Sequence, residues 1–259
     1  MIEKIDFHID ALDAMKKYPK ELYYIGDITL LQRKKIAIVG SRKPNQYARN
    51  LTQQLASKLA HAGSCIVSGG AIGVDAIAHK AAGAKNTIMV AATGLDKRYP
   101  AINKNIIEAI EKEGLVLSQF QEKTASNRYN FVLRNEVVVA LGEALIVTYA
   151  DDNSGTMRSV EYAMKMGKKI YVLPHRIGES EGTNRLLSQG MAEAIYDIDA
   201  FVNSFYGKVE HPHELSDFML FCKSEPTYEE AVARFATEVF EAELRGEIGV
   251  ENGRIRVLA

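Results

Sequence analysis

Two polar turns are the part of this 259-residue sequence whose residue types could do chemistry. The first is Gly40-Ser41-Arg42-Lys43, and the second runs from Ser68 to Gly73. Glycine lets a backbone approach a ligand closely, and an adjacent arginine supplies a permanent positive charge. A helix that starts behind such a turn adds free N–H groups and the positive end of its dipole. The combination predicts phosphate binding; the alternative is that the glycines only make tight turns and the serines only cap helices.

Each turn follows a short apolar run without alternation, Ile36–Val39 in one case and Cys65–Val67 in the other. Such runs are typical of strands that are covered on both faces of a parallel sheet. Between them, Leu51, Leu55 and Leu59 recur at helical spacing. Because the carboxyl ends of parallel strands meet at one edge of the sheet, we expect both turns to lie there, where such folds bind ligands.

The same alternation of strands and helices continues to about Phe205. Further strands are expected at 87–91, 115–118, 144–149 and 169–173, and helices at about 75–82, 102–110, 131–141 and 157–164. The loop 121–130 contains Arg128, and the loop 150–156 contains Ser154 and Gly155. Thr183-Asn184 follow the loop 179–182. This order predicts an α/β fold with a doubly wound, mostly parallel sheet.

The composition, 47% hydrophobic and 25% charged with a formal net charge of -1, is that of an ordinary globular protein. No apolar run approaches the roughly 18 residues that span a bilayer, and the polar amino terminus does not resemble a signal peptide. The two cysteines, Cys65 and Cys222, lie far apart and predict reduced thiols in a cytoplasmic protein. Because neither has metal-ligand neighbours and no HExxH motif occurs, we expect no metal and no cofactor.

The carboxyl-terminal part, 210–259, predicts a second, small domain. Helices are expected at 214–222, 228–234 and 237–245, followed by a hairpin over 248–257 that turns at Asn252-Gly253. Helices followed by a hairpin indicate a winged-helix-like domain. Eleven carboxylates against five Lys and Arg residues from Glu210 onward would repel a phosphate backbone, so we expect a protein-contact or structural role. Residues 1–34 are expected to be a lead-in that packs on the 35–205 domain.

Several motifs then match a known family. IAIVGSRKPNQYA, IVSGGAIGVDAIAHKAA, GLDKRYPAIN, FVLRN, SGT and EGTNRLLSQG occur in the order found in the DNA-processing protein A (DprA/Smf) family, so that residues 18–190 resemble it. The resemblance implies an extended Rossmann-like fold without catalytic activity. It implies a homodimer that binds single-stranded DNA and loads the recombinase RecA on incoming DNA during natural transformation.

The predicted phosphate- and single-stranded-DNA-binding residues combine these turns with the motif matches. They are Gly40, Ser41, Arg42, Lys43, Ser68, Gly69, Gly70, Gly73, Arg128, Phe131, Arg134, Asn135, Ser154, Gly155, Thr183 and Asn184. Two positions depart from the family pattern. Ala48 stands where many members have glycine, and Glu136 stands where many have arginine, which removes a cation from that side of the site.

Two other functions fit parts of the sequence. Nucleoside-monophosphate phosphoribohydrolases resemble this fold but use a PGGxGTxxE turn; this chain has DDNSGTMRSVE, with Glu161 five residues after Thr156 rather than three. On a helix that spacing places the carboxylate on a different face. A nucleotide-sensing module, with the carboxyl-terminal part as its output domain, is the other alternative.

Overall fold

The structure is a computed structural model that describes residues 1–206, 217–244 and 248–257. It contains two compact units, Met1–Gly207 and Lys208–Ala259. The first unit is built on a nine-stranded sheet with the order β1-β2-β6-β5-β4-β3-β7-β8-β9. In the described part of the chain, no helix is both long enough and apolar enough to cross a membrane.

The strands from β3 to β9 are all parallel to one another. They are β3 (Lys35–Val39), β4 (Cys65–Ser68), β5 (Thr87–Val90), β6 (Leu115–Ser118), β7 (Ala144–Val147), β8 (Lys169–Val172) and β9 (Glu193–Ala194). Every residue of β3 to β7 is buried, because helices cover both faces of the sheet. The predicted doubly wound, mostly parallel sheet is therefore confirmed; β9 is an additional short strand.

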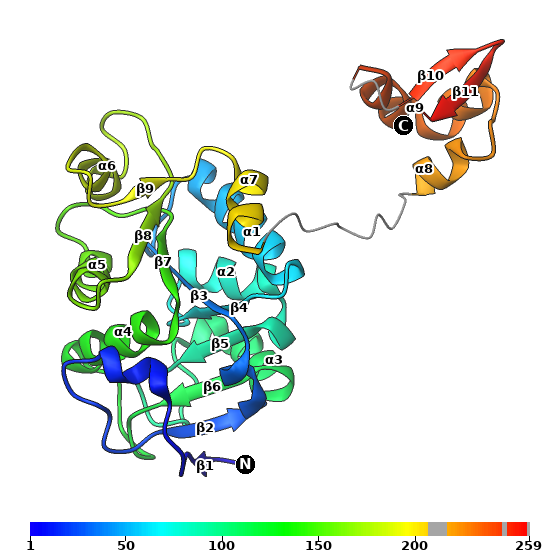
Figure 1. The fold of residues 1–259 in the computed structure, drawn as a ribbon. Coiled ribbons are helices and arrows are strands. Elements are labelled where there is room, and N and C mark those ends of the chain that lie inside the picture. The colour runs from blue at the N-terminus through cyan, green and yellow to red at the C-terminus, as the bar shows by residue number, and fades with distance from the viewer. Residues whose placement is uncertain (207–216, 245–247, 258–259) are drawn as a thin grey trace. The chain divides into compact units, whose positions relative to one another are not determined.

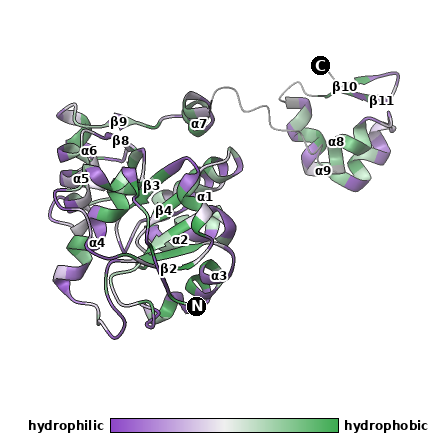
Figure 2. Ribbon diagram, turned by 60° about the horizontal axis from the view of Figure 1, so that its bottom comes forward, coloured by the Kyte–Doolittle hydropathy of each residue, from purple (hydrophilic) through white to green (hydrophobic). Residues whose placement is uncertain are grey.

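Helices lie on both faces of this sheet (Figure 1). One face carries α1 (Gln46–His61), α2 (Val74–Ala82), α3 (Lys104–Glu113) and α7 (Ile198–Tyr206), and the other carries α4 (Arg128–Leu141), α5 (Gly155–Lys165) and α6 (Glu181–Ser188). Hydrophobic residues concentrate in the strands and polar residues on the outer helix surfaces (Figure 2). The core thus forms two apolar layers, one on each side of the sheet.

The amino-terminal residues extend the sheet as well as packing on it. The strand β2 (Tyr23–Gly26) pairs antiparallel with β6, and β1 (Glu3–Lys4) pairs antiparallel with β2. Two short 3₁₀ helices, η1 (Asp10–Ala14) and η2 (Ile28–Gln32), complete this region, and η1 packs against α4. The Glu136 carboxylate accepts a hydrogen bond of 3.0 Å from the backbone N–H of Lys16. Glu136 therefore ties the lead-in to α4.

Two helices begin earlier than expected. The helix α4 starts at Arg128, so that the predicted loop 121–130 ends at Asn127, whose side chain accepts from the Asn130 N–H at 2.8 Å. This is an ordinary N-cap, and the asparagine was its sequence signal. The helix α6 starts at Glu181, directly after Ser180 in the left-handed region (φ 47°). Thr183 and Asn184 are therefore helical residues.

The second unit contains α8 (Asp217–Cys222), α9 (Tyr228–Leu244) and a hairpin of β10 (Ile248–Glu251) and β11 (Arg254–Val257). The backbone of Phe235 breaks α9 into two helical parts. The hairpin turns at Asn252-Gly253, both with positive φ, as the dipeptide predicts. A small apolar core fills this unit, with Phe218 and Val239 among its buried residues. The predicted helical positions 214–216 and 245 lie outside the described residues.

Candidate nucleic-acid interface

The strand order reverses at β3, which has β4 on one side and β7 on the other. The turns that follow β3, β4 and β5 lie at the carboxyl edge of the sheet, and the first turns of α4 reach the same place. They enclose a small pocket of about 80 Å³. Its lining residues are Arg42, Gly69, Ala71, Ile72, Ala92, Tyr99, Pro100, Phe131 and Arg134. The structure therefore brings four of the predicted site residues together: Arg42, Gly69, Phe131 and Arg134.

Arg134 is the buried centre of this pocket, with 5% of its surface exposed. Its guanidinium donates to the carbonyl oxygen of Gly69 and, at 2.8 Å, to that of Val90 at the end of β5. Its Nε donates to the Asn135 side chain at 3.1 Å. The planar fork of arginine suits this task because it presents several donors in fixed directions. Arg134 thus links the turn after β4, the end of β5 and the helix α4.

The glycines of the second turn lie where other protein atoms occupy the space that a side chain would need. A Cβ on Gly69 would lie 2.4 Å from the Arg134 guanidinium, and one on Gly70 would lie 2.5 Å from the Met89 sulfur. Gly73 has φ +82°, and a Cβ there would lie 2.4 Å from the Ser41 carbonyl oxygen. The two predicted turns are therefore in direct contact, and their glycines are required by this close packing.

Two backbone N–H groups of the second turn donate hydrogen bonds to a side chain of the protein itself. The buried carboxylate of Asp75 accepts from the N–H groups of Gly69 and Ala71 at 3.2 and 3.3 Å. Burial raises the pKa of Asp75, and the nearby Arg134 charge opposes this rise. The amides of Gly69 and Ala71 thus face an internal carboxylate, although the sequence argument expected such amides to face a phosphate. The charges that face solvent are Arg42 and Lys43, in the neighbouring turn after β3.

The exposed groups around the pocket are cationic and aromatic. Of the predicted cations, Arg42 lines the pocket, whereas Lys43 follows it in the chain and Arg128 lies one helical turn before Phe131. All three are exposed, and no carboxylate pairs with them in the described residues. The guanidinium carbon of Arg42 lies 5.5 Å from the centre of the half-buried Phe131 ring, and that of Arg134 lies 5.9 Å from it. Two arginines therefore flank one aromatic ring, a favourable cation–π arrangement. Such a rim can hold phosphates and stack bases.

Other predicted residues have internal roles. Gly40 packs against Val74, and the Ser68 hydroxyl donates to the Ile38 carbonyl oxygen at 2.6 Å. The Ser41 hydroxyl accepts from the Lys43 N–H, and the Ser41 N–H donates to the Tyr149 carbonyl oxygen. These contacts hold the two turns in place and bring the end of β7 beside the first turn.

The predicted residues after β7 and β8 do not line the pocket. Ser154 and Gly155 form the amino-terminal end of α5. Thr183 is buried and donates to the Ser180 carbonyl oxygen at 2.9 Å. The Asn184 amide donates to the carbonyl oxygens of His175, Arg176 and Glu179, which fixes the loop before α6. Glu161, the carboxylate that a hydrolase would need, is exposed and pairs with Arg158 at 2.9 Å.

Two residues from the segment after β5 contribute to the site although they were not predicted from the sequence. The exposed Tyr99 lines the pocket, with its ring centre 5.9 Å from that of Phe131. The buried Asn103 donates to the Gly70 carbonyl oxygen at 2.9 Å and thereby joins this segment to the glycine turn. The motif GLDKRYPAIN contains both residues, so a signal was present, but nothing in one sequence shows which strand end the motif adjoins.

Comparison with known proteins shows the family to which the first unit belongs. The family model described as DNA recombination-mediator protein A matches residues 6–206. A solved structure of DNA processing protein A from Helicobacter pylori, whose single-stranded DNA binding mode it describes, is 40% identical, with a TM-score of 0.78; the match covers 79% of this chain and 95% of that one. The Streptococcus pneumoniae protein DprA is 32% identical, with a TM-score of 0.70 and coverages of 75% and 70%.

Sequence relatives give the same result. Protein Smf from Synechocystis is 34% identical over 185 residues, which are 68% of this chain and 46% of that protein. The chain spans about half the length of the curated relatives it matches, from 45% to 62%. Because the family model covers most of the chain and the relatives agree with it, this protein belongs to the DNA recombination-mediator protein A (DprA/Smf) family.

Proposed function

We propose that this protein binds single-stranded DNA at the carboxyl edge of its sheet and acts there as a recombination mediator. The observation that carries the proposal is the pocket rim, where Arg42 and Phe131 lie beside the buried Arg134. Arg42, Lys43 and Arg128 would contact phosphates, and Phe131 would stack on a base. The H. pylori relative, which binds single-stranded DNA, is similar over nearly its whole length.

The chemistry of the rim favours a single strand over a duplex. Stacking on an aromatic side chain requires a base whose face is free, which a duplex does not offer. A mononucleotide would use only one base and one phosphate, whereas the exposed cations lie on two separate elements, the turn after β3 and the start of α4. A strand that crosses from one element to the other would use both.

The wider role follows from the family. We propose that the protein forms a homodimer in the cytoplasm and loads RecA on incoming DNA in natural transformation, without catalysing a reaction itself. The family description, a recombination mediator, supports this assignment. Sedimentation of the protein with and without an oligonucleotide tests the dimer. RecA filament assembly on protein-bound strands tests the loading step.

The direct test of binding is fluorescence anisotropy of a labelled oligothymidylate at several salt concentrations, with a duplex of equal length beside it. The expected result is tight binding of the single strand, with log K falling by about 0.7 per phosphate contact for each log unit of salt. Arg42→Ala is expected to weaken binding and to lower this slope by about 0.7. The matched control is Lys165→Ala, which removes an exposed cation at the carboxyl-terminal end of α5, near the edge of the sheet opposite the pocket.

Two outcomes would contradict the proposal. If the parent protein binds neither DNA at moderate salt, single-stranded DNA is not its ligand. If it binds the single strand but Arg42→Ala and Lys165→Ala lose affinity equally, binding is a general effect of charge and the site is wrong.

A further inference from the structure

The segment between β5 and α3 carries an exposed aromatic residue, Tyr99, which has no role in the proposed function. Tyr99 is 46% exposed, although its ring lines the pocket. Its ring centre lies 5.9 Å from that of Phe131, with the ring planes inclined by 43°. Tyr99 differs from a solitary exposed aromatic because its ring lines a pocket beside a second aromatic ring. The two rings stand as adjacent walls at the mouth of one small pocket.

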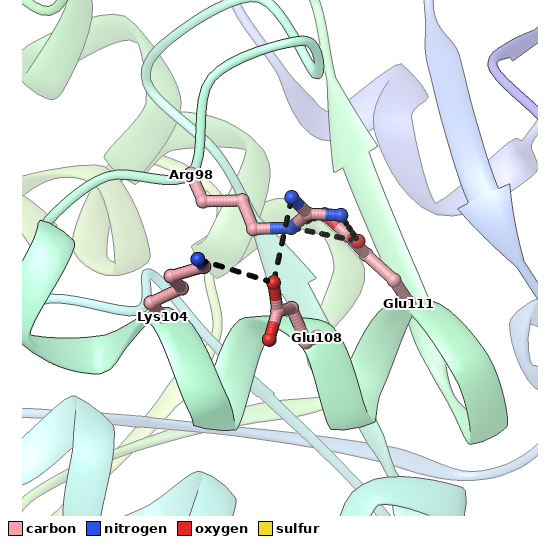
Figure 3. A network of polar contacts seen from close by, with 4 residues as sticks. All are labelled: Arg98, Lys104, Glu108 and Glu111. Atoms are coloured by element: carbon pink, nitrogen blue, oxygen red, sulfur yellow. Dashed lines mark hydrogen bonds and ion pairs between the residues drawn. The ribbon is translucent and has the colours of Figure 1, made fainter.

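The residue before Tyr99 is held by a forked ion pair. Nε of Arg98 lies 3.0 Å from Oε2 of Glu111 and its Nη2 lies 2.7 Å from the same oxygen, while Oε1 accepts from Nε at 3.1 Å. The neighbouring Glu108 makes only a longer contact of 3.5 Å with Arg98 and also faces Lys104 at 3.8 Å (Figure 3). The Glu111 side chain is only 12% exposed. Fork-to-carboxylate contacts of this kind add directional control as well as attraction.

The other end of the same segment is also fixed. The buried Asn103 donates to the carbonyl oxygen of Gly70, in the turn that Arg134 closes from the other side. The segment from Arg98 to Asn103 is therefore anchored to α3 at one end and to the glycine turn at the other. Tyr99 lies between these anchors, so its ring is positioned relative to Phe131 even though nearly half of it is exposed.

We infer that Tyr99 is a second base-stacking wall of the single-stranded DNA site, and that the ion pair between Arg98 and Glu111 positions it. This inference rests on the proposed function, since it names a part of the same site. Its ligand class is an unpaired nucleobase, which enters beside Phe131 while the exposed cations hold the neighbouring phosphates. Glu111 is a positioning residue, because it acts only through Arg98 and the segment that follows.

The stacking role is tested with intact and abasic oligonucleotides of equal length. A stacked base contributes an amount that corresponds to about 5- to 150-fold in affinity, so Tyr99→Ala is expected to weaken oligothymidylate binding within this range. Tyr99→Phe should retain the affinity, because the ring alone is needed. On the abasic strand, Tyr99→Ala should change affinity by less than about twofold, whereas Arg42→Ala should weaken binding to both strands.

The outcomes separate the inference from the proposed function. Equal loss by Tyr99→Ala on intact and abasic strands, or no loss on either, overturns the stacking role while single-stranded DNA binding stands. Failure of the parent protein to bind either strand overturns the proposed function itself. Thermal unfolding of each variant shows whether an altered fold accounts for a loss.

The positioning role has a matched pair of variants on α3. Glu111→Gln and Glu108→Gln remove the same charge from neighbouring turns, but only the first breaks the forked pair with Arg98. Because the chain has no tryptophan, Tyr99→Trp introduces a single indole at the site. In that background, Glu111→Gln should increase acrylamide quenching of the indole and weaken oligothymidylate binding about two- to fivefold, and Glu108→Gln should do neither. Equal behaviour of the two variants overturns the positioning role.

Discussion

The guanidinium of Arg134 donates a hydrogen bond to the carbonyl oxygen of Gly69, so that a cation from α4 fills the space left by a missing side chain in the turn after β4. This contact connects the two faces of the sheet at its carboxyl edge. It explains why the turn needs glycine there, and it sets the position of Phe131 one helical turn earlier. The geometry of the rim therefore depends on a buried polar contact beneath it.

Gly69→Ala should destabilise the fold. The added methyl group would lie 2.4 to 2.7 Å from three atoms of the Arg134 guanidinium, which would have to leave its hydrogen bonds. Overpacking and a lost buried hydrogen bond together predict a decrease of about 1–3 kcal/mol in the free energy of unfolding. Urea denaturation measures it. Gly155→Ala, where nothing lies within 4 Å of the new Cβ, is the control and should be nearly neutral; equal effects of the two substitutions would refute the steric account.

Arg134→Lys should destabilise the protein although the charge is kept. A lysine presents one ammonium group and cannot reproduce the fork that serves Gly69, Val90 and Asn135 together. We expect the free energy of unfolding to fall by about 1–3 kcal/mol, because buried carbonyl groups lose their donor. The exposed Arg42→Lys is the comparison and should change stability by less than about 0.5 kcal/mol. An Arg134→Lys protein as stable as its parent would show that charge alone is sufficient.

The stability of the first unit should fall below pH 6.5 because of His79. Burial, assisted by the Arg134 charge, lowers the pKa of His79 from 6.5 to about 3. The buried ring also makes a hydrogen bond of 2.6 Å between its Nδ1 and the Thr87 hydroxyl. The unfolded chain therefore takes up a proton first as the pH falls. The contribution of His79 is fully present above pH 6.5 and is lost toward pH 3, at about 1.4 kcal/mol per pH unit.

Urea unfolding of the parent and of His79→Gln between pH 7.5 and 4.5 measures this effect. The variant starts with lower stability, and the difference between the two proteins should shrink as the pH falls. His61→Gln, at an exposed position on α1, controls for the loss of a histidine. A constant difference between parent and His79→Gln over this range would mean that His79 does not titrate as its burial requires.

The second unit should not contribute to DNA binding. The second half of α9 exposes Glu238, Glu241 and Glu243. The hairpin of β10 and β11 offers only Arg254 and Arg256 as cations among the described residues. Arg256 already pairs with Glu251 at 3.2 Å. We therefore expect Arg254→Gln and Arg256→Gln, made together, to change the affinity for single-stranded or duplex DNA by less than about twofold. A loss comparable to that of Arg42→Ala would assign the hairpin to the DNA site.

The central sheet could be predicted from the sequence because its signal is local. Ile36–Val39 and Cys65–Val67 are continuous apolar runs. Such short runs are typical of strands that are buried on both faces of a parallel sheet. The strand β2 is harder to recognise, because Tyr23–Gly26 is only partly buried and pairs with β6, about ninety residues later. Its assignment depends on a partner that no local pattern reveals.

The candidate site likewise contains residues that local motifs identify and residues whose roles depend on contacts formed only in the folded chain. The exposed cations and Phe131 could be named from their motifs, whereas the burial of Arg134 depends on a gap at Gly69 that only the folded chain creates. Thr183 and Asn184 were expected to face a ligand because they follow a strand, yet their side chains are used to hold the loop before α6. Polar residues at a strand end can serve either purpose, and one sequence does not distinguish them.

Photo-crosslinking identifies the residues that lie against a bound single strand. An oligonucleotide that carries 5-bromouracil is bound to the 259-residue protein, and the complex is irradiated. The protein is then digested, and the linked peptides are identified by mass spectrometry. If the single strand binds at the carboxyl edge of the sheet, links are expected in the peptides that contain Tyr99 and Phe131, and an excess of unsubstituted single strand should abolish them. Links confined to the second unit, or to the opposite edge of the sheet near Lys165, would contradict binding at the carboxyl edge.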